Sequence, residues 1–161
     1  MSDTPSLLQF LSDVRGISGF EGRVARFVRD QLAPIAEVTC DNLGSVLCRL
    51  RSSGPGPRVA LAGHMDEIGF MVKLVTKEGF VKFQTVGGWW DQVLLGQRVV
   101  IETHKGEVVG VIGAKPPHLL QEDKRNTVVK VDDMFIDVGA SSKEQVEELG
   151  VRPGDPIVPD S

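Results

Sequence analysis

The sequence predicts an α/β fold in two parts, an N-terminal α/β unit over residues 1–67 and a small β-barrel over residues 68–161. Three observations predict this class. Apolar residues recur at helical spacing in the first third of the chain, short strand-like runs separated by glycine-bearing turns fill the rest, and a hydrophobic content of 41% is enough for a core. The pattern changes after His64, which places the boundary near residue 67.

Two amphipathic helices are expected first. The first, ended by Gly16, is predicted by an apolar stripe made of Leu7, Leu8, Leu11 and Val14. The second, ended by Pro34, is predicted by a stripe made of Val24, Phe27, Val28 and Leu32. A dinucleotide-binding motif would require a strand before its glycines. The glycines between the two helices, from Gly16 to Gly22, follow no strand, so this segment is expected to be a loop between helices.

A β-hairpin is expected next. Ile35 to Cys40 and Ser45 to Leu50 are short runs rich in strand-forming residues, and they flank Asp41-Asn42-Leu43-Gly44. In this turn Gly44 is free to adopt a positive φ. Farther along, Val59 to Ala62 is a nearly continuous apolar run, which predicts a strand covered by helices on both faces.

The chain contains two cysteines, Cys40 and Cys48. They are too far apart for a Cys-x-x-Cys pair and are surrounded by apolar residues. This setting favours buried, reduced thiols over a disulfide or a zinc site.

A barrel is expected after residue 67 because short strands follow one another with few helices between them. The predicted strands are Phe70 to Thr76, Phe80 to Val86, Gln97 to Thr103 and Glu107 to Ile112. Ser141, with Glu144 three residues later, predicts a capping box for a short helix that runs through Leu149 and ends at Gly150.

Charge and hydropathy exclude several classes of protein. The net charge is −4, with Lys and Arg scattered, so no basic stripe predicts binding to nucleic acid or to an anionic membrane. The N-terminus lacks a charged segment followed by an apolar one, and no apolar run approaches the length of a bilayer span. These features favour a cytoplasmic protein.

The most informative motif is His64-Met-Asp66-Glu67, directly after the apolar run. In an extended chain, residues two apart share a face, so His64 and Asp66 are expected to project to the same side. The carboxylate can then accept the proton of one ring nitrogen while the other nitrogen remains a metal ligand. From spacing alone, however, a histidine that is merely hydrogen-bonded to the aspartate is the more common outcome.

Five motifs, in order, carry a family resemblance: His64 to Val72, Gly87 to Asp91, Leu95 to Val99, Gly110 to His118 and Phe135 to Ala140. Together they resemble the cobalt- or zinc-dependent aminopeptidases that build tetrahedral particles. That family includes glutamyl and leucyl aminopeptidases and proteins named cellulase M or endoglucanase M. One departure is the doubled Trp89 and Trp90, where the family usually has a single tryptophan.

The resemblance implies an enzyme that hydrolyses N-terminal residues from peptides with metal-activated water. It implies that residues 1–67 form the N-terminal part of a zinc-peptidase-like catalytic domain and that residues 68–161 form a PDZ-like dimerisation domain, the dimers building a tetrahedral dodecamer. By this match His64 ligates one of two divalent ions, zinc or cobalt, and Asp66 is the catalytic-site residue that orients its ring. The remaining ligands and the general base would lie downstream of the barrel, so this chain is expected to supply one ligand.

Two acidic pairs and the other two histidines are not expected in the site. Glu147-Glu148 and Asp132-Asp133 imitate acidic motifs of the family, but their positions predict a solvated helix face and a loop before a strand. His104 lies in a predicted hairpin turn, and His118 follows two prolines, which favours a structural or interface role. A two-metal site needs more ligands than these, including a bridging carboxylate.

Three functions remain open at this point. The first is the N-terminal fragment of a dinuclear aminopeptidase. The second is a non-catalytic oligomerisation module, and the third is an endoglucanase-like glycoside hydrolase, which would need two carboxylates flanking a sugar cleft. Two local alternatives also stay open. Glu67 either approaches the metals or faces water, and Trp89 is expected to cover the barrel end while Trp90 is partly exposed at a partner surface.

Overall fold

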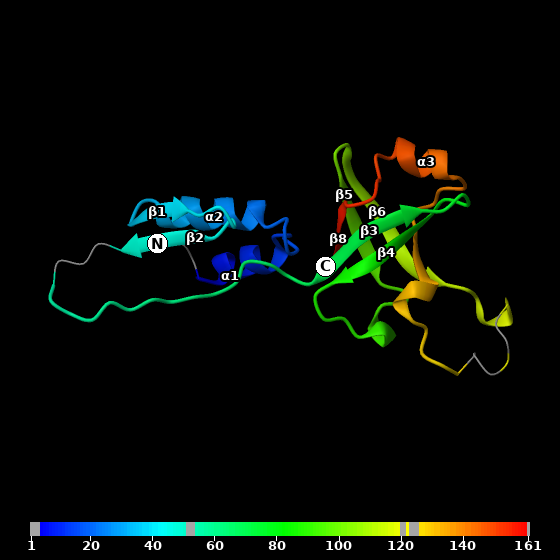
Figure 1. Cartoon of the computed structure of the whole chain (residues 1–161), viewed down its shortest axis with the longest axis horizontal. Helices are drawn as coiled ribbons and strands as arrows, with labels where there is room; N and C mark the ends of the chain where they lie inside the picture. Colours follow the sequence, from blue (N-terminus) through cyan, green and yellow to red (C-terminus); the bar gives the residue numbers. More distant parts are fainter. Residues whose placement is uncertain (1–3, 51–53, 120–121, 123–125, 161) are drawn as a thin grey trace. The chain divides into compact units, whose positions relative to one another are not determined.

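The computed structural model describes residues 4–50, 54–119, 122 and 126–160. It divides the chain into two compact units, Met1–Glu67 and Ile68–Ser161. The first contains two helices and a hairpin, and the second contains a closed barrel (Figure 1). The predicted α/β class with a small barrel is therefore confirmed. None of the described helices is both long and apolar enough to cross a membrane.

The first unit begins with α1 (Thr4–Asp13) and α2 (Gly22–Leu32), as the apolar stripes predict. The two helices meet through aromatic side chains, since the rings of Phe10 and Phe27 stack with centroids 3.9 Å apart. Helix α2 also packs on the hairpin that follows it. The segment between α1 and α2 is a loop, which confirms the interpretation of its glycines.

The hairpin consists of β1 (Ala36–Cys40) and β2 (Val46–Leu50), paired antiparallel as a two-stranded sheet. Its turn uses Gly44 at φ +89°, the positive value that glycine adopts without steric cost. The Asp41 carboxylate accepts hydrogen bonds from the backbone N–H groups of Leu43 and Ser45, each 2.9 Å long. The sequence prediction of this hairpin is confirmed.

The predicted burial of the cysteines is wrong. Cys40 and Cys48 are both free thiols and both exposed. A two-stranded sheet has two faces, and α2 packs on this hairpin without burying either thiol. The apolar neighbours in the sequence thus did not indicate a core.

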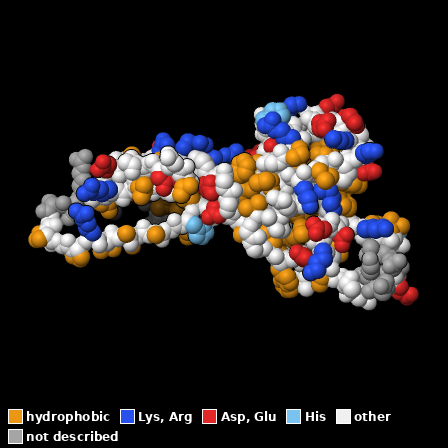
Figure 2. All heavy atoms as spheres, viewed as in Figure 1, with side chains coloured by type: hydrophobic (Ala, Val, Ile, Leu, Met, Phe, Trp, Pro, Cys, Tyr) orange, Lys and Arg blue, Asp and Glu red, His pale blue; other side chains and the backbone are white. Residues whose placement is uncertain are grey.

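The predicted strand over Val59 to Ala62 is also wrong. This run belongs to no hydrogen-bonded ladder among the described residues, and Val59 and Leu61 are 78% and 97% exposed. Hydrophobic side chains accordingly lie at the surface along this extended segment (Figure 2). A buried strand needs neighbouring strands at its edges, whereas among the described residues of this unit β1 and β2 pair only with each other.

The second unit is a closed, all-antiparallel barrel in the strand order β3-β4-β7-β6-β5-β8. Closure leaves no free sheet edge. The four strands predicted by spacing are present, and the short β8 between two prolines was not predicted. The bounds are β3 (Gly69–Val75), β4 (Phe80–Val86), β5 (Arg98–Thr103), β6 (Gly106–Ala114), β7 (Met134–Asp137) and β8 (Pro156–Pro159).

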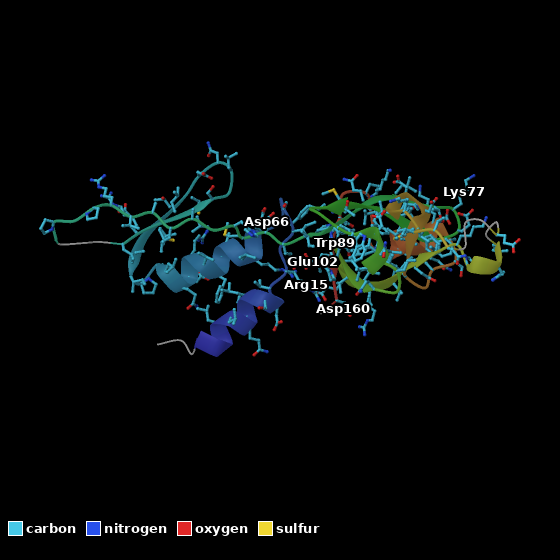
Figure 3. The ribbon with its side chains drawn as sticks, turned by 90° about the horizontal axis from the view of Figure 1, so that it is seen from below. Arg15, Asp66, Lys77, Trp89, Glu102 and Asp160 are labelled. Carbon is cyan, nitrogen blue, oxygen red and sulfur yellow. The ribbon has the colours of Figure 1, made fainter. Side chains whose placement is uncertain are left out.

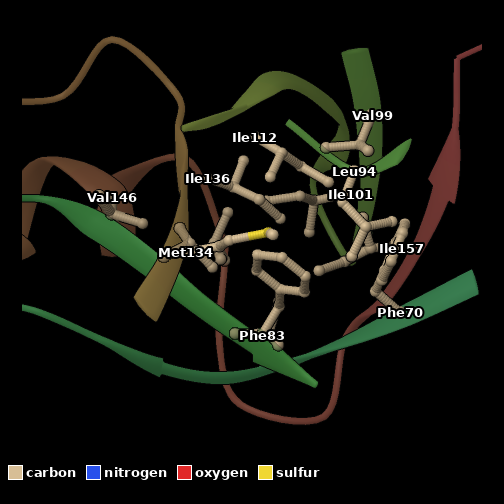
Figure 4. Close-up of a cluster of buried hydrophobic side chains, with 13 residues drawn as sticks. Phe70, Phe83, Leu94, Val99, Ile101, Ile112, Met134, Ile136, Val146 and Ile157 are labelled. Atoms are coloured by element: carbon tan, nitrogen blue, oxygen red, sulfur yellow. The ribbon is translucent and has the colours of Figure 1, made fainter. Parts of the chain in front are cut away.

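The interior of the barrel is a continuous apolar core (Figure 4). Its members come from every strand and from the segments at the barrel ends, and each is at most 3% exposed. The cluster comprises Phe70, Val72, Val81, Phe83, Leu94, Val99, Ile101, Ile112, Met134, Ile136, Val146, Val151 and Ile157. The inward positions are filled by side chains, so the barrel is a packed core and not a channel.

Helix α3 (Lys143–Glu148) contributes Val146 to this core. The predicted cap is wrong by one residue, because the N-cap is Ser142, whose Oγ accepts from the backbone N–H of Gln145 at 3.4 Å. The Gln145 side chain accepts in turn from the backbone N–H of Ser141 at 2.8 Å. Two adjacent serines made either assignment compatible with the sequence, and the extended φ and ψ of Ser142 (−152° and 163°) decide between them.

Candidate functional site

The candidate site lies on the extended run that precedes the barrel unit, within the first compact unit. His64 directs its ring nitrogen Nδ1 at Asp66, 2.8 Å from the backbone carbonyl oxygen and 3.0 Å from the carboxylate oxygen Oδ1. Both of these oxygens only accept hydrogen bonds, so Nδ1 carries the proton. In the neutral ring, Nε2 then holds the lone pair with which an imidazole binds a metal.

Little else fixes the His64 ring. Its side chain is 86% exposed, whereas the Asp66 side chain is 37% exposed. The sequence-predicted pair is thus brought together on one side of the extended backbone, although this segment is not the tip of a paired strand. The hydrogen bonds through Nδ1 are the contacts that set the direction of Nε2.

Asp66 is held in its turn by a residue far away in the sequence. The hydroxyl of Ser18, in the loop between α1 and α2, donates a short hydrogen bond to the Asp66 oxygen Oδ2. This bond is the largest cause of a lowered pKa for the Asp66 carboxyl, and the hydrogen bond from His64 contributes less. Figure 3 labels Asp66 on the extended chain of the first unit. The carboxylate form, which accepts from both partners, is therefore favoured.

Glu67 joins the same loop by a different route. Its backbone N–H donates to the carbonyl oxygen of Gly16 at 2.8 Å, and its carboxylate oxygen Oε1 accepts from the Gly16 backbone N–H at 3.0 Å. Ile17 and Glu67 form an isolated parallel β-bridge. The Glu67 side chain thus ties two segments together, which neither of the two sequence-based alternatives described.

The remaining histidines lie elsewhere. His104 is exposed in the turn between β5 and β6, where the sequence predicts it, and His118 is exposed in the 3-10 helix η2 (Pro117–Leu119). Within the residues that the structure describes, no group of three or more His, Cys, Asp or Glu side chains is arranged to hold a metal ion.

The two acidic pairs, Glu147-Glu148 and Asp132-Asp133, belong to elements of the barrel unit. Glu147, on α3, forms an ion pair with Lys143 at 3.5 Å, and the Glu148 backbone carbonyl accepts from Lys105 at 2.9 Å. Asp132 and Asp133 lie in the 3-10 helix η4 (Val131–Asp133), directly before β7. Both pairs belong to the barrel unit, as their sequence positions predict.

The donor chemistry fits a divalent metal at one corner. A neutral imidazole held by a carboxylate through its other nitrogen is the usual arrangement for a histidine that binds zinc or cobalt. His64 supplies such a nitrogen, and both oxygens of the Asp66 side chain already accept hydrogen bonds. A catalytic zinc site normally takes three protein ligands, so further ligands would have to join His64.

The two tryptophans differ as expected. Trp89 stacks on Phe70 with ring centroids 4.6 Å apart, and its Nε1–H donates to the backbone oxygen of Gly69 at 2.9 Å. Trp90 is 64% exposed. Trp89 therefore packs against the barrel core, whereas the Trp90 side chain is exposed at the surface.

Ser18 is the residue that sequence reasoning missed. It is separated from Asp66 by 48 positions, and its neighbours show the composition of an ordinary turn. Serine is common in such turns because its hydroxyl bonds to nearby backbone. No local pattern distinguishes a turn serine from one that reaches a distant carboxylate.

Comparison with known proteins places this chain in a protein family. The model of the M42 glutamyl aminopeptidase family matches residues 44–161. The lysyl aminopeptidase of Pyrococcus furiosus is 39% identical over 151 residues, which are 92% of this chain and 43% of that protein. The chain spans less than half the length of the curated relatives it matches.

Solved structures agree. The TET aminopeptidase of Thaumarchaeota archaeon SCGC AB-539-E09 superposes with a TM-score of 0.91 at 50% identity, covering 97% of this chain and 44% of that one. The Pyrococcus horikoshii TET1 peptidase, which can assemble into a tetrahedron or a large octahedral shell, has a TM-score of 0.85 at 37% identity, covering 98% and 47%. The chain therefore belongs to the M42 glutamyl aminopeptidase family.

Proposed function

We propose that this chain is the N-terminal part of a metal-dependent aminopeptidase that removes N-terminal residues from peptides. The observation that carries the proposal is the state of the His64 imidazole. Its hydrogen bonds to Asp66 hold the ring proton on Nδ1, and the exposed side chain leaves Nε2 available to a metal. The names of the family and of its members supply the reaction class.

His64 binds one divalent ion through Nε2, and Asp66 orients the ring. When bound, two such ions, zinc or cobalt, supply Lewis-acid polarisation of the scissile carbonyl and of the attacking water. The Asp66 carboxylate keeps the proton on Nδ1 by accepting it in a hydrogen bond. This matters for metal binding, because a proton on Nε2 would remove the lone pair that binds the ion. Asp66 thus acts on the reaction by holding a proton at a defined atom.

The remaining ligands and the general base come from the part of the longer protein that this chain does not contain. The barrel unit serves in dimerisation, and the dimers assemble into a tetrahedral particle in the cytoplasm. Similarity to the TET1 peptidase supports self-association. The exposed Trp90, on the loop before the 3-10 helix η1 (Asp91–Val93), is the side chain we place at that partner surface.

The test uses the natural polypeptide that contains this chain. Incubated with zinc or cobalt, it is expected to release N-terminal amino acids from short peptides, and His64→Ala is expected to abolish the release. His104→Ala is the matched control, since His104 is exposed in a turn of the barrel unit and is expected to keep full activity. Equal activity of His64→Ala and the unmodified protein would overturn the proposal.

Two further measurements separate the alternatives. An oligomerisation module without chemistry would assemble but release no amino acid, and it would bind no metal in a titration. A glycoside hydrolase would cleave carboxymethylcellulose, and we expect no cleavage. Trp89 is not available to bind a sugar, because its ring stacks on Phe70.

A further inference from the structure

We infer that Ser18 is a positioning residue for the His64 imidazole, acting through Asp66. The consequence of this inference for catalysis rests on the proposed function. The positioning of the His64 ring by Ser18 can be tested on the metal-free chain. The loop between α1 and α2, over residues 14–21, then holds the predicted metal ligand in position and does not merely connect the two helices.

The His64 side chain is largely exposed to solvent. A side chain that is 86% exposed gains no fixed direction from packing, so its orientation comes from the bonds of Nδ1 to Asp66. One of those bonds goes to the carboxylate oxygen Oδ1. The terminal torsion of an aspartate is broad, which means that the carboxylate has no sharp direction of its own.

Ser18 supplies the missing constraint. Its hydroxyl donates to Oδ2 while Oδ1 accepts from His64, so the two oxygens are held from opposite ends of the carboxylate. With both oxygens held, rotation about the Cβ–Cγ bond breaks two hydrogen bonds at once. The direction of the Asp66 carboxylate is therefore set by a residue that lies 48 positions earlier in the sequence.

The loop is itself held in place. Gly16 exchanges two hydrogen bonds with Glu67, the residue directly after Asp66. On the other side of Ser18, Gly19 adopts φ +88° and donates its N–H to the Glu21 carboxylate at 2.8 Å. The backbone on each side of the Ser18–Asp66 bond is thus fixed, which makes Ser18 a defined support rather than a transient contact.

The experiment is long-range ¹H–¹⁵N NMR on the metal-free 161-residue chain, at a pH where the ¹⁵N shifts themselves show the imidazole rings to be neutral. Unconstrained neutral imidazoles prefer the proton on Nε2, so a His64 ring in the Nδ1–H form reports the Asp66 bonds directly. Ser18→Ala is expected to lower the ratio of Nδ1–H to Nε2–H by about two- to tenfold, the effect of losing one hydrogen bond. Ser18→Thr keeps the hydroxyl and is expected to restore the ratio.

Two controls make the result specific. Ser12→Ala removes another hydroxyl of the same unit, one that bonds to the Leu8 carbonyl, and is expected to leave the His64 ratio unchanged. The backbone N–H of Glu67, bonded to Gly16, reports in every variant whether the loop remains docked. An unchanged ratio in Ser18→Ala, or a failure of Ser18→Thr to restore it, would overturn the inference.

The outcome is independent of the proposed function. The tautomer ratio is measured without metal or peptide, so a chain that proved inactive as an aminopeptidase could still show the Ser18 effect. An active enzyme could equally show none. In the longer natural polypeptide, Ser18→Ala is expected to weaken zinc or cobalt binding by about tenfold, the lower end of the range for residues behind a ligand.

Discussion

His64 and Asp66 form a pair in which the imidazole donates from Nδ1 to two oxygens of the same residue, one from the backbone and one from the side chain. The backbone acceptor cannot rotate away when the carboxylate does. The arrangement therefore fixes the proton on Nδ1 more firmly than a carboxylate alone would. It explains how a largely exposed ring can present Nε2 in one direction.

Asp66→Asn tests the chemical role of the carboxylate. An asparagine can turn its NH₂ group toward Nδ1, where it competes with the backbone oxygen of residue 66 and shifts the ring proton toward Nε2, which weakens the ligand lone pair's availability. We expect the natural polypeptide carrying this change to bind zinc about 10- to 100-fold more weakly, measured by competition with a chelator. Asp137→Asn, at a carboxylate of the barrel unit that accepts from the Gly139 N–H, is the control. Equal zinc affinity in the unmodified protein and Asp66→Asn would contradict this role.

The hairpin turn gives a pH prediction away from the candidate site. The backbone N–H of Ser45 is the largest cause of a lowered pKa for Asp41, with the Ser45 side chain and the Leu43 N–H adding to it. Because this pKa is lower in the folded than in the unfolded chain, the turn is stabilised above the unfolded pKa. That stabilisation is lost as the pH falls through the folded pKa.

NMR titration of the Asp41 carboxyl checks this sign. We expect its midpoint below that of an aspartate in an unstructured peptide, and we expect the Leu43 and Ser45 amide signals to move with it. In Asp41→Asn, which keeps an acceptor oxygen but does not titrate, these amides are expected to show no acid transition. A midpoint at the ordinary value would refute the structural account of the turn.

The barrel core offers a matched pair of truncations. Val99 is fully buried in β5, and Val109 is 51% exposed in β6. Val99→Ala is expected to lower the free energy of unfolding by about 2 kcal/mol, from roughly 0.8 kcal/mol per buried methylene plus a cavity term. Val109→Ala is expected to change it by less than about 0.5 kcal/mol.

Tryptophan fluorescence during urea unfolding measures this difference. Both tryptophans, Trp89 and Trp90, belong to the barrel unit, so the signal reports that unit. Equal loss of stability in the two variants would mean that the interior and exterior positions of the barrel are assigned incorrectly.

Local patterns predicted most of the fold because the elements concerned carry their own periodicity. The stripes that define α1 and α2, and the glycine turns between the barrel strands, depend only on neighbouring residues. The run from Val59 to Ala62 shows the limit of this reasoning. Its composition is that of a buried strand, but a strand also needs partners, and the described part of the first unit supplies none for it.

The candidate site divides in the same way. Spacing alone placed His64 and Asp66 on one side of the extended chain, since two residues with this separation share a face. Ser18 depends instead on how the loop after α1 folds back onto the segment at Glu67. A contact of this kind is set by tertiary structure, and no pattern within a few residues encodes it.

The most direct test of the account is a crystal structure of the natural polypeptide that contains this chain, grown with zinc or cobalt. We expect a metal ion within about 2.0 to 2.1 Å of the His64 nitrogen Nε2, with Nδ1 still bonded to Asp66 and Ser18 still bonded to the carboxylate. A metal bound through Nδ1, or a metal centre to which His64 does not contribute, would contradict the central claim.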